Sequence, residues 1–151
     1  MKIMIGQLEH ESVITLLTQH LEDMNATSPP DSVHALDVSR LRSPEVTFWT
    51  AWHGDVLLGC AALKQLDDTH GELKSMRTSD QARKQGVASR LLVHVLDYSR
   101  DIGLHRVSLE TGSMAFFEPA RRLYEKFGFH YCEPFAEYTP DPNSRFMTLT
   151  L

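Results

Sequence analysis

A short basic loop that leads directly into a helix is the part of this sequence best suited to binding a ligand. The loop contains Arg83, Lys84 and Gly86, and an apolar-striped run from Val87 to Ile102 follows it. The first turn of a helix has unpaired backbone N–H groups and lies at the positive end of the helix dipole, so it attracts anions. Gly86 has no Cβ and lets an oxygen-rich ligand approach the backbone, while the two basic side chains add positive charge. The loop therefore predicts a site for a pyrophosphate group.

The residues just before this loop, from Glu72 onward, are predicted to form a strand. In a regular strand Glu72, Lys74 and Met76 share one face. A carboxylate and an ammonium group on that face could hold a zwitterion such as an amino acid. The alternative is a solvated strand face on which Glu72 and Lys74 form only a weak ion pair. The sequence leaves both interpretations open.

A second block further along the chain makes the loop more specific. It runs from Ala120 to Phe129 and contains the pattern Leu-Tyr-x-Lys-x-Gly-Phe, which includes Tyr124. The loop itself, Arg-Lys-Gln-Gly-Val-Ala, fits the pattern Q/R-x-x-G-x-G/A between a strand and a helix. Together the two blocks resemble the GCN5-related N-acetyltransferase (GNAT) superfamily. The resemblance covers essentially the whole chain, because the expected order of strands and helices also agrees, and it implies a single acetyltransferase domain over residues 1–151.

The family transfers an acetyl group from acetyl-CoA to a primary amine, and the resemblance implies where acetyl-CoA binds. The backbone of Met76 and Thr78, with Arg77 between them, would pair with the pantetheine arm as an added strand does. Tyr124 matches the tyrosine that commonly protonates the departing thiolate. The backbone amides that would hold the pyrophosphate belong to Arg83, Lys84, Gln85, Gly86, Val87 and Ala88.

One position departs from the family pattern. Many relatives have an asparagine seven residues before the tyrosine, where this chain has Phe117. Ser113 could make the corresponding CoA contact instead, so Ser113 and Phe117 are both expected beside the cofactor. Glu118 and Pro119 suit the first turn of a helix, so this helix is expected to begin nearer Phe117 than Ser113.

Forming an amide from a thioester requires a neutral amine, a polarised carbonyl and a protonated leaving group. A strand amide near Met76 could bond the thioester oxygen, where negative charge develops. Tyr124, with an ordinary pKa of about 10, is a suitable acid toward a thiolate whose pKa is about 8.5 or somewhat higher. Glu72 is the leading candidate to accept the ammonium proton, directly or through water, because it begins the strand that borders the acceptor side.

The family places its acceptor pocket between the first two helices and the loop before the last strand. Polar segments of this chain fall at those places, and the residues expected to bind the acceptor are Ser28, His34, Lys74 and Tyr138. Each also has a purely structural interpretation. Ser28 lies in a proline-containing turn, His34 could cap a helix or bond at the surface, and Tyr138 could be a packed loop aromatic.

The elements that must position these residues follow from the periodicity of the apolar side chains. Strands are expected at residues 2–5, 46–52, 56–66, from 72, 106–110, 129–135 and 146–151, and helices at 7–25, 35–41, 87–102 and 116–127. The fold class is α/β (α+β), with a mixed, mostly antiparallel sheet of six to seven strands and about four helices on both faces. The three strands between residues 46 and the basic loop form an antiparallel meander.

Composition excludes several other functions. The net charge of -5 argues against nucleic acid and anionic membranes as partners, and no apolar run is long enough to cross a bilayer. The amino terminus lacks the apolar core of a signal peptide, and Cys60 and Cys132 form neither a disulfide framework nor a zinc pattern. The eight histidines are scattered without ligand spacing, so no metal is expected. A cytoplasmic location is the default expectation.

The most direct interpretation is an enzyme that transfers acetyl from acetyl-CoA to the primary amine of a small molecule. One alternative is a protein or peptide N-acetyltransferase, which needs an open groove, whereas the proline-rich loops here favour a covered pocket. The other is a non-catalytic acyl-CoA-binding module, against which an intact Tyr124 argues. Many relatives pair through sheet edges or last strands, so the resemblance leaves a homodimer open.

Overall fold

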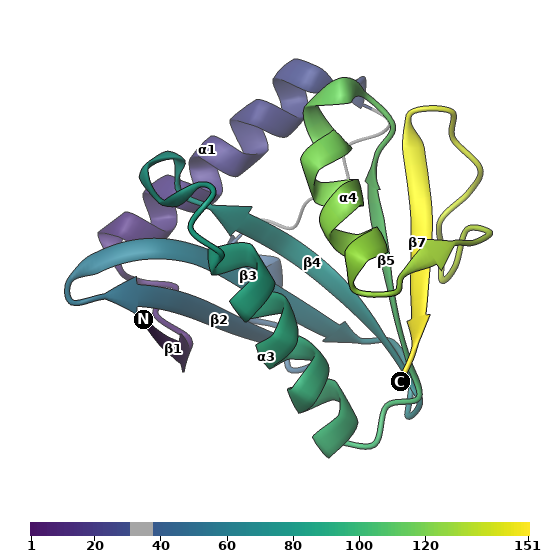
Figure 1. Cartoon of the computed structure of the whole chain (residues 1–151), viewed down its shortest axis with the longest axis horizontal. Coiled ribbons are helices and arrows are strands. Elements are labelled where there is room, and N and C mark those ends of the chain that lie inside the picture. Colours follow the sequence, from purple (N-terminus) through teal and green to yellow (C-terminus); the bar gives the residue numbers. More distant parts are fainter. Residues whose placement is uncertain (31–37) are drawn as a thin grey trace.

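The structure, a computed structural model, describes residues 1–30 and 38–151 and contains one seven-stranded sheet in the order β1-β2-β3-β4-β5-β7-β6 (Figure 1). The pairing of β4 with β5 is parallel and every other pairing is antiparallel. The elements are β1 (Lys2–Ile5), α1 (Glu11–Thr27), α2 (Val38–Leu41), β2 (Val46–His53), β3 (Val56–Gln65), β4 (His70–Thr78), α3 (Val87–Asp101), β5 (Arg106–Gly112), α4 (Glu118–Lys126), β6 (His130–Tyr131) and β7 (Ser144–Thr150), with short 3-10 turns at Asp80–Ala82 and Ala115–Phe117. The predicted mixed sheet and the antiparallel meander β2–β3–β4 are confirmed.

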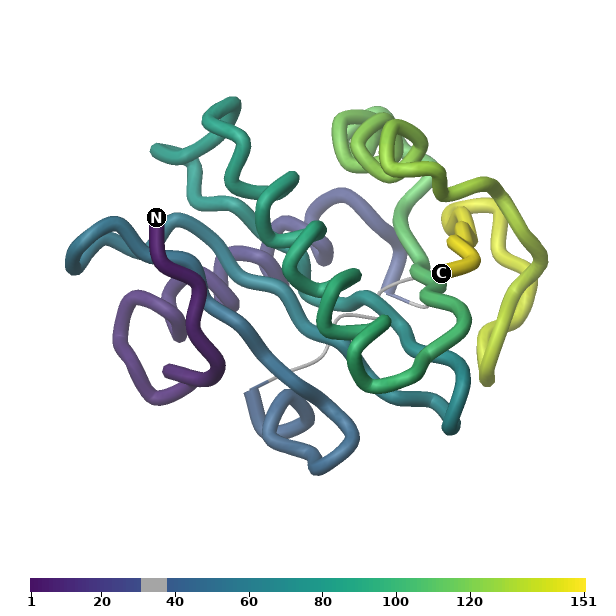
Figure 2. The backbone as a smooth tube through the Cα atoms, turned by 60° about the horizontal axis from the view of Figure 1, so that its bottom comes forward, coloured from purple at the N-terminus to yellow at the C-terminus, as the bar shows by residue number. Residues whose placement is uncertain are grey.

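Helices cover both faces of the sheet. Figure 2 shows α3 and α4 on one side, and α1 with α2 on the other. The larger core cluster lies under α3, where the apolar stripe of Leu91, Leu92 and Val95 is fully buried. A second cluster joins Val13 and Leu17 of α1 to β2 and β3. The number and placement of the helices thus agree with the prediction from periodicity.

Several boundaries differ from the sequence-based prediction for local reasons. Helix α1 begins at Glu11 because the His10 side chain accepts a hydrogen bond from the Ser12 amide and caps it. Helix α4 begins at Glu118 with a proline in its first turn, as expected. The strand expected at 129–135 is only two residues long, since Pro134 lacks an amide hydrogen for the sheet. The part of the second helix predicted at 35–37 lies outside the described residues.

Strand β4 is interrupted by a β-bulge, which changes the direction of its side chains. Its register with β3 shifts between Cys60 and Ala62, and Ser75 has a left-handed φ of 54°. Met76 therefore packs into the same core cluster as Leu73. The prediction that Met76 shares a face with Glu72 and Lys74 is wrong, because an extra residue in a bulge reverses the alternation beyond it.

The contact between β3 and α3 depends on one glycine. A Cβ on Gly59 would lie 2.7 Å from the carbonyl oxygen of Arg77 and 3.2 Å from the side chain of Val87. We expect Gly59→Ala to lower the free energy of unfolding by about 2 kcal/mol, because the backbone of β4 would have to move. Gly71→Ala is the matched control, since its Cβ would meet only the flexible ends of Leu104 and Leu63. Urea midpoints test this; equal losses in both variants would contradict it.

Candidate active site

The two parallel strands separate in the middle of the sheet. β4 pairs with β5 only up to Leu73 and Leu109, and beyond this point the strands diverge (Figure 1). A cavity of about 100 Å³ lies at the divergence, lined by side chains from both faces of the sheet. Its walls include His20 of α1, Glu110 of β5 and Tyr124 of α4. Chemical groups that the sequence separates widely are therefore collected in one small space.

Tyr124 is a buried phenol within this cavity. It is 6% exposed and its ring packs against Phe129. Burial and the nearby Glu110 carboxylate both raise its pKa above the ordinary value. Tyr124 therefore holds its proton firmly at neutral pH, and the raised pKa makes it a weaker acid than a free phenol.

Glu110 is the ionisable group that sequence analysis missed. Burial raises its pKa to about 7, an effect that the Ser144 hydroxyl and then the Lys74 ammonium partly oppose and the Glu72 carboxylate reinforces. A carboxyl group with this pKa exchanges its proton near neutral pH, which suits a general base. The available signal was weak: Glu110 is the one acidic residue of β5, on the side of the strand opposite Leu109.

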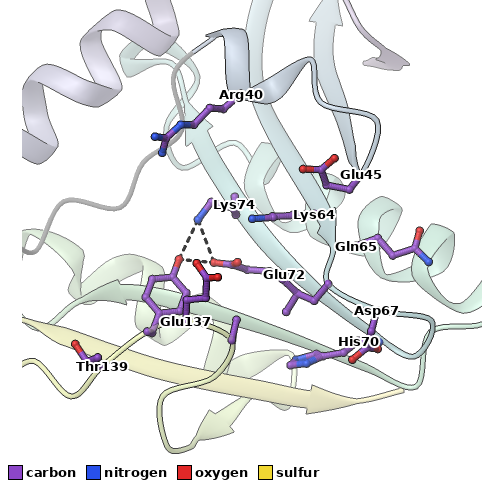
Figure 3. Close-up of a pocket in the computed structure, with 13 residues that line it drawn as sticks. Arg40, Glu45, Lys64, Gln65, Asp67, His70, Glu72, Lys74, Glu137 and Thr139 are labelled. Atoms are coloured by element: carbon purple, nitrogen blue, oxygen red, sulfur yellow. Dashed lines mark hydrogen bonds and ion pairs between the residues drawn. The ribbon is translucent and has the colours of Figure 1, made fainter.

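Glu72, which sequence analysis selected as the proton acceptor, is held in a buried hydrogen-bonded cluster instead. Lys74 Nζ lies 3.1 Å from Glu72 Oε2 and donates at 2.9 Å to the Tyr138 hydroxyl, which itself donates to Glu72 (Figure 3). The side chains of Lys74 and Glu72 are 8% and 4% exposed. The pairing of Glu72 with Lys74 therefore exists, but the alternative of a solvated strand face with only a weak ion pair is wrong. Tyr138 also packs on Phe146, as its interpretation as a packed loop aromatic predicts, while acceptor binding by Tyr138 stays a prediction.

A larger pocket of about 850 Å³ opens on the other side of this cluster, and it shares Glu72 and Lys74 with the cavity. In Figure 3, Arg40 and Glu45 lie on one side of the pocket and Asp67 and His70 at one end. Its lining is mostly charged or polar. The pocket and the cavity are therefore neighbours that share the wall formed by Glu72 and Lys74.

The predicted pyrophosphate loop has the geometry that its sequence indicated. Gly86 caps α3 with a left-handed φ of 79°, and a Cβ built there would meet nothing within 4 Å. Lys84 is also left-handed, with φ 63°, and Arg83 pairs with Asp80 at 2.9 Å in an exposed position. The amides of the first turn of α3 have no acceptor within the helix. These residues fit a pyrophosphate group.

The unpaired edge of β4 fits the other half of the cofactor. Beyond Leu73 no β5 residue pairs with Met76, Arg77 or Thr78, so their backbone groups on this side can accept an added strand. The Arg77 side chain turns away and pairs with Asp23 of α1.

The remaining predicted site residues are placed unevenly. Phe117 lines the cavity and its ring fills the space beside Gly112, while the Ser113 hydroxyl donates to the carbonyl oxygen of Pro142 at 2.8 Å. Ser28 is the C-cap of α1 and is buried, but it lines neither the cavity nor the larger pocket. His34 lies outside the described residues.

Two further findings concern metals and membranes. Within residues 1–30 and 38–151, no three His, Cys, Asp or Glu side chains are grouped so that they could hold a metal ion. In the same residues, no helix has the length and apolar character needed to span a bilayer.

Comparison with known proteins agrees with this geometry. Residues 13–129 match the family model described as acetyltransferase (GNAT) family. The chain is 56% identical over 151 residues to the uncharacterized N-acetyltransferase YsnE of Bacillus subtilis (strain 168), and the match covers 100% of both chains. A solved structure from Klebsiella pneumoniae, assigned provisionally as an acyl-CoA N-acyltransferase, has a TM-score of 0.83 at 26% identity and covers 99% of this chain and 97% of that chain.

A more distant structure contains the co-substrate. The GNAT family acetyltransferase of Elizabethkingia anophelis, solved with acetyl-CoA bound, has a TM-score of 0.72 at 17% identity, with coverage of 99% of this chain and 97% of that chain. Fold and site together define an acyltransferase that works on a CoA thioester. The chain belongs to the acetyltransferase (GNAT) family, and the expectation of an acetyl-CoA-dependent N-acetyltransferase is confirmed.

The raised pKa of Glu110 predicts a pH dependence of stability. Between its ordinary pKa of 4.5 and about 7, folded Glu110 keeps a proton that the unfolded chain has released, so the stability it contributes is lost as pH rises. A shift of this size corresponds to about 3 kcal/mol. Glu110→Gln should therefore gain about 3 kcal/mol of unfolding free energy relative to wild type from about pH 4 to about pH 8. Urea unfolding at several pH values tests this, with exposed Glu22→Gln as the control for charge; a constant difference would contradict it.

The loop geometry predicts a specific loss of cofactor affinity. Arg83→Glu should weaken acetyl-CoA binding about tenfold, because it places a negative charge beside the predicted pyrophosphate site. Arg100→Glu, at the opposite end of α3, is the control and should bind as wild type does. Calorimetric titration with acetyl-CoA measures both constants. Equal affinities in the two variants would show that the loop does not hold the cofactor.

Proposed function

We propose that this enzyme transfers acetyl from acetyl-CoA directly to the primary amine of a small molecule, with Tyr124 as the general acid and Glu110 as the general base. The observation that carries the proposal is the pairing of these two groups in one cavity. Glu110 has a pKa of about 7, whereas Tyr124 has a raised pKa, and both line the divergence of β4 and β5. Two groups whose environments separate their pKa values are suited to opposite proton transfers.

The proposed reaction exchanges one bond at the carbonyl carbon and needs three proton transfers. The acceptor arrives as an ammonium ion, and the Glu110 carboxylate takes one proton to leave a neutral amine. The amine nitrogen then bonds to the thioester carbonyl carbon while a backbone amide near Met76 stabilises the oxygen. When the carbon–sulfur bond breaks, Tyr124 donates its proton to the thiolate, and the second proton leaving the amine nitrogen restores the Tyr124 phenol. The products are the N-acetylated amine and the free thiol of CoA.

Glu110 is favoured over Glu72 as the base because of their hydrogen bonds. Glu72 accepts from both Lys74 and Tyr138, so taking a further proton would break a buried ion pair. Glu110 forms no ion pair among residues 1–30 and 38–151. In this proposal Glu72 fixes the positions of Lys74 and Tyr138 at the border between the cavity and the larger pocket.

A small acceptor is supported by the shape of the larger pocket. Tyr138 and Thr139, from the loop before β7, contribute one wall, and Lys74 contributes another. We therefore keep Lys74 and Tyr138 as acceptor-binding candidates, while Ser28 has no support beyond the resemblance. A pocket walled on several sides suits a small molecule better than a polypeptide.

The proposed setting is the cytoplasm. Both cysteines of the chain, Cys60 and Cys132, are free thiols, and Cys60 is buried. Proteins kept under reducing conditions usually have such cysteines.

Substituting the two proposed catalytic groups should separate their roles. Tyr124→Phe and Glu110→Gln should each lower kcat about 100-fold and leave the KM for acetyl-CoA unchanged. In wild type kcat/KM should rise with pH until about pH 7, and this limb should disappear in Glu110→Gln. The measurement is CoA thiol release over a panel of amines.

Glu72→Gln serves as the comparison for these variants. In this variant kcat/KM should still rise with pH until about pH 7, and the KM of the acceptor should change more than kcat. If the rise of kcat/KM up to about pH 7 were lost in Glu72→Gln and kept in Glu110→Gln, the general base would be Glu72. Tight CoA binding by wild type without acetylation of any amine would favour a binding module, and acetylation only of polypeptides in a cell extract would favour a protein acetyltransferase.

A further inference from the structure

Two buried polar atoms beside the catalytic cavity have no partner. His20 Nδ1 and Ser75 Oγ are shielded from solvent and form no hydrogen bond with the described residues. Both side chains line the cavity that contains Glu110 and Tyr124. An unpaired buried polar atom costs about 1–3 kcal/mol, so such atoms usually have a ligand or water as their partner. Their position indicates that a polar part of the substrates lies between α1 and β4.

The charges around His20 are arranged so that its imidazole stays neutral. Burial and the Arg77 guanidinium lower its pKa to about 4, against a smaller opposing effect of Asp23. A neutral imidazole does not repel an incoming ammonium group, and one of its nitrogens can accept a hydrogen bond. His20 is too weak a base at this pKa to deprotonate an amine, which separates its role from that of Glu110.

Among the described residues, Lys74 is the lysine or arginine that lines this cavity, and it is already paired, as is Arg77 near His20. Lys74 donates to Glu72 and Tyr138, and Arg77 pairs with Asp23. Among the residues described as lining the cavity, a substrate carboxylate would meet no lysine or arginine without a partner, and it would lie near the Glu110 carboxylate. The wall therefore favours an ammonium group and disfavours a carboxylate on the adjacent carbon.

We propose that His20 Nδ1 accepts a hydrogen bond from the acceptor nitrogen while Glu110 takes its proton, and that the preferred acceptors are amines whose α-carbon carries no carboxylate. This inference rests on the proposed function and narrows its substrate class. His20 is a positioning residue for the nitrogen, and the paired state of Lys74 and Arg77 sets the selectivity. The zwitterion suggested by the sequence of β4 is accordingly not the preferred ligand.

The selectivity is tested with four matched pairs of acceptors, each an α-amino acid and the amine that remains without its carboxylate. The pairs are leucine and isopentylamine, tyrosine and tyramine, histidine and histamine, and arginine and agmatine. In every pair that reacts, kcat/KM for the amine should be at least about tenfold higher. A preference for the amino acid would overturn the inference and leave the proposed function intact. If none of the eight is acetylated by enzyme that binds acetyl-CoA, the proposed function fails and the inference with it.

The role of His20 is tested with variants that place a hydrogen-bond acceptor differently. The Asn oxygen can occupy the position of Nδ1, whereas the Gln oxygen is nearer that of Nε2. His20→Leu and His20→Gln should raise the acceptor KM about tenfold with little change in the KM for acetyl-CoA, and His20→Asn should restore most of it. The rise of kcat/KM with pH until about pH 7 should persist in all three variants.

Exposed His105→Asn is the control and should behave as wild type. Equal acceptor KM values for His20→Leu and wild type would overturn the assignment. Equal defects in His20→Leu and His20→Asn would also overturn it, because they would show a role in packing only. Loss of the pH limb in a His20 variant would contradict the separation of roles between His20 and Glu110.

Discussion

The end of parallel pairing between β4 and β5 is the constraint on which the rest of this molecule depends. Up to Leu73 and Leu109 the strands bond to each other, and beyond these residues both strands present backbone groups that need another partner. The bulge at Ser75 turns β4 away and brings Met76 into the core under the helices. One local irregularity thereby produces a free strand edge for a ligand and a cavity that side chains from both faces can reach.

The buried cluster of Glu72, Lys74 and Tyr138 fixes the charge on one wall of that cavity. Removing two charges from water is costly, and the attraction between them offsets the cost only when their remaining hydrogen bonds are satisfied. Tyr138 supplies such a bond to both partners, so each charge is compensated. Glu110, on the neighbouring strand, forms no ion pair with the described residues, and burial raises its pKa more than Ser144 and Lys74 lower it. Two carboxylates of similar sequence context consequently have different chemistry.

The parts of the fold governed by local sequence could be predicted, and the parts governed by tertiary contacts could not. The start of α3 directly after Gly86 and the apolar stripe of α3 follow from residue types alone, and both were found as expected. The bulge at Ser75 leaves no signature in the sequence, because serine in a left-handed conformation is rare and is imposed by the surrounding sheet. A prediction that assumes a regular strand therefore places Met76 on the wrong face of β4.

The same limit applied to the site, where the choice between Glu72 and Glu110 depended on partners distant in the chain. Glu72 begins a strand that a family resemblance marks as functional, so sequence reasoning selected it. Glu72 is held by a hydrogen bond from Tyr138, which lies in a loop before the last strand. The burial that tunes Glu110 comes from the packing of several elements around the cavity. Neither fact can be read from the residues near each carboxylate.

In the proposed mechanism, the proximity of Glu110 and Tyr124 also links proton uptake by Glu110 to proton donation by Tyr124 in time. The ionised Glu110 carboxylate contributes to the raised pKa of Tyr124, so the phenol holds its proton most firmly before the acceptor is deprotonated. When Glu110 takes the proton of the ammonium group, its negative charge disappears and the pKa of Tyr124 falls. The acid therefore becomes stronger only after the nucleophile has been generated, which is when the departing thiolate needs a proton. A base and an acid in one low-dielectric cavity can thus act in sequence without any movement of the backbone.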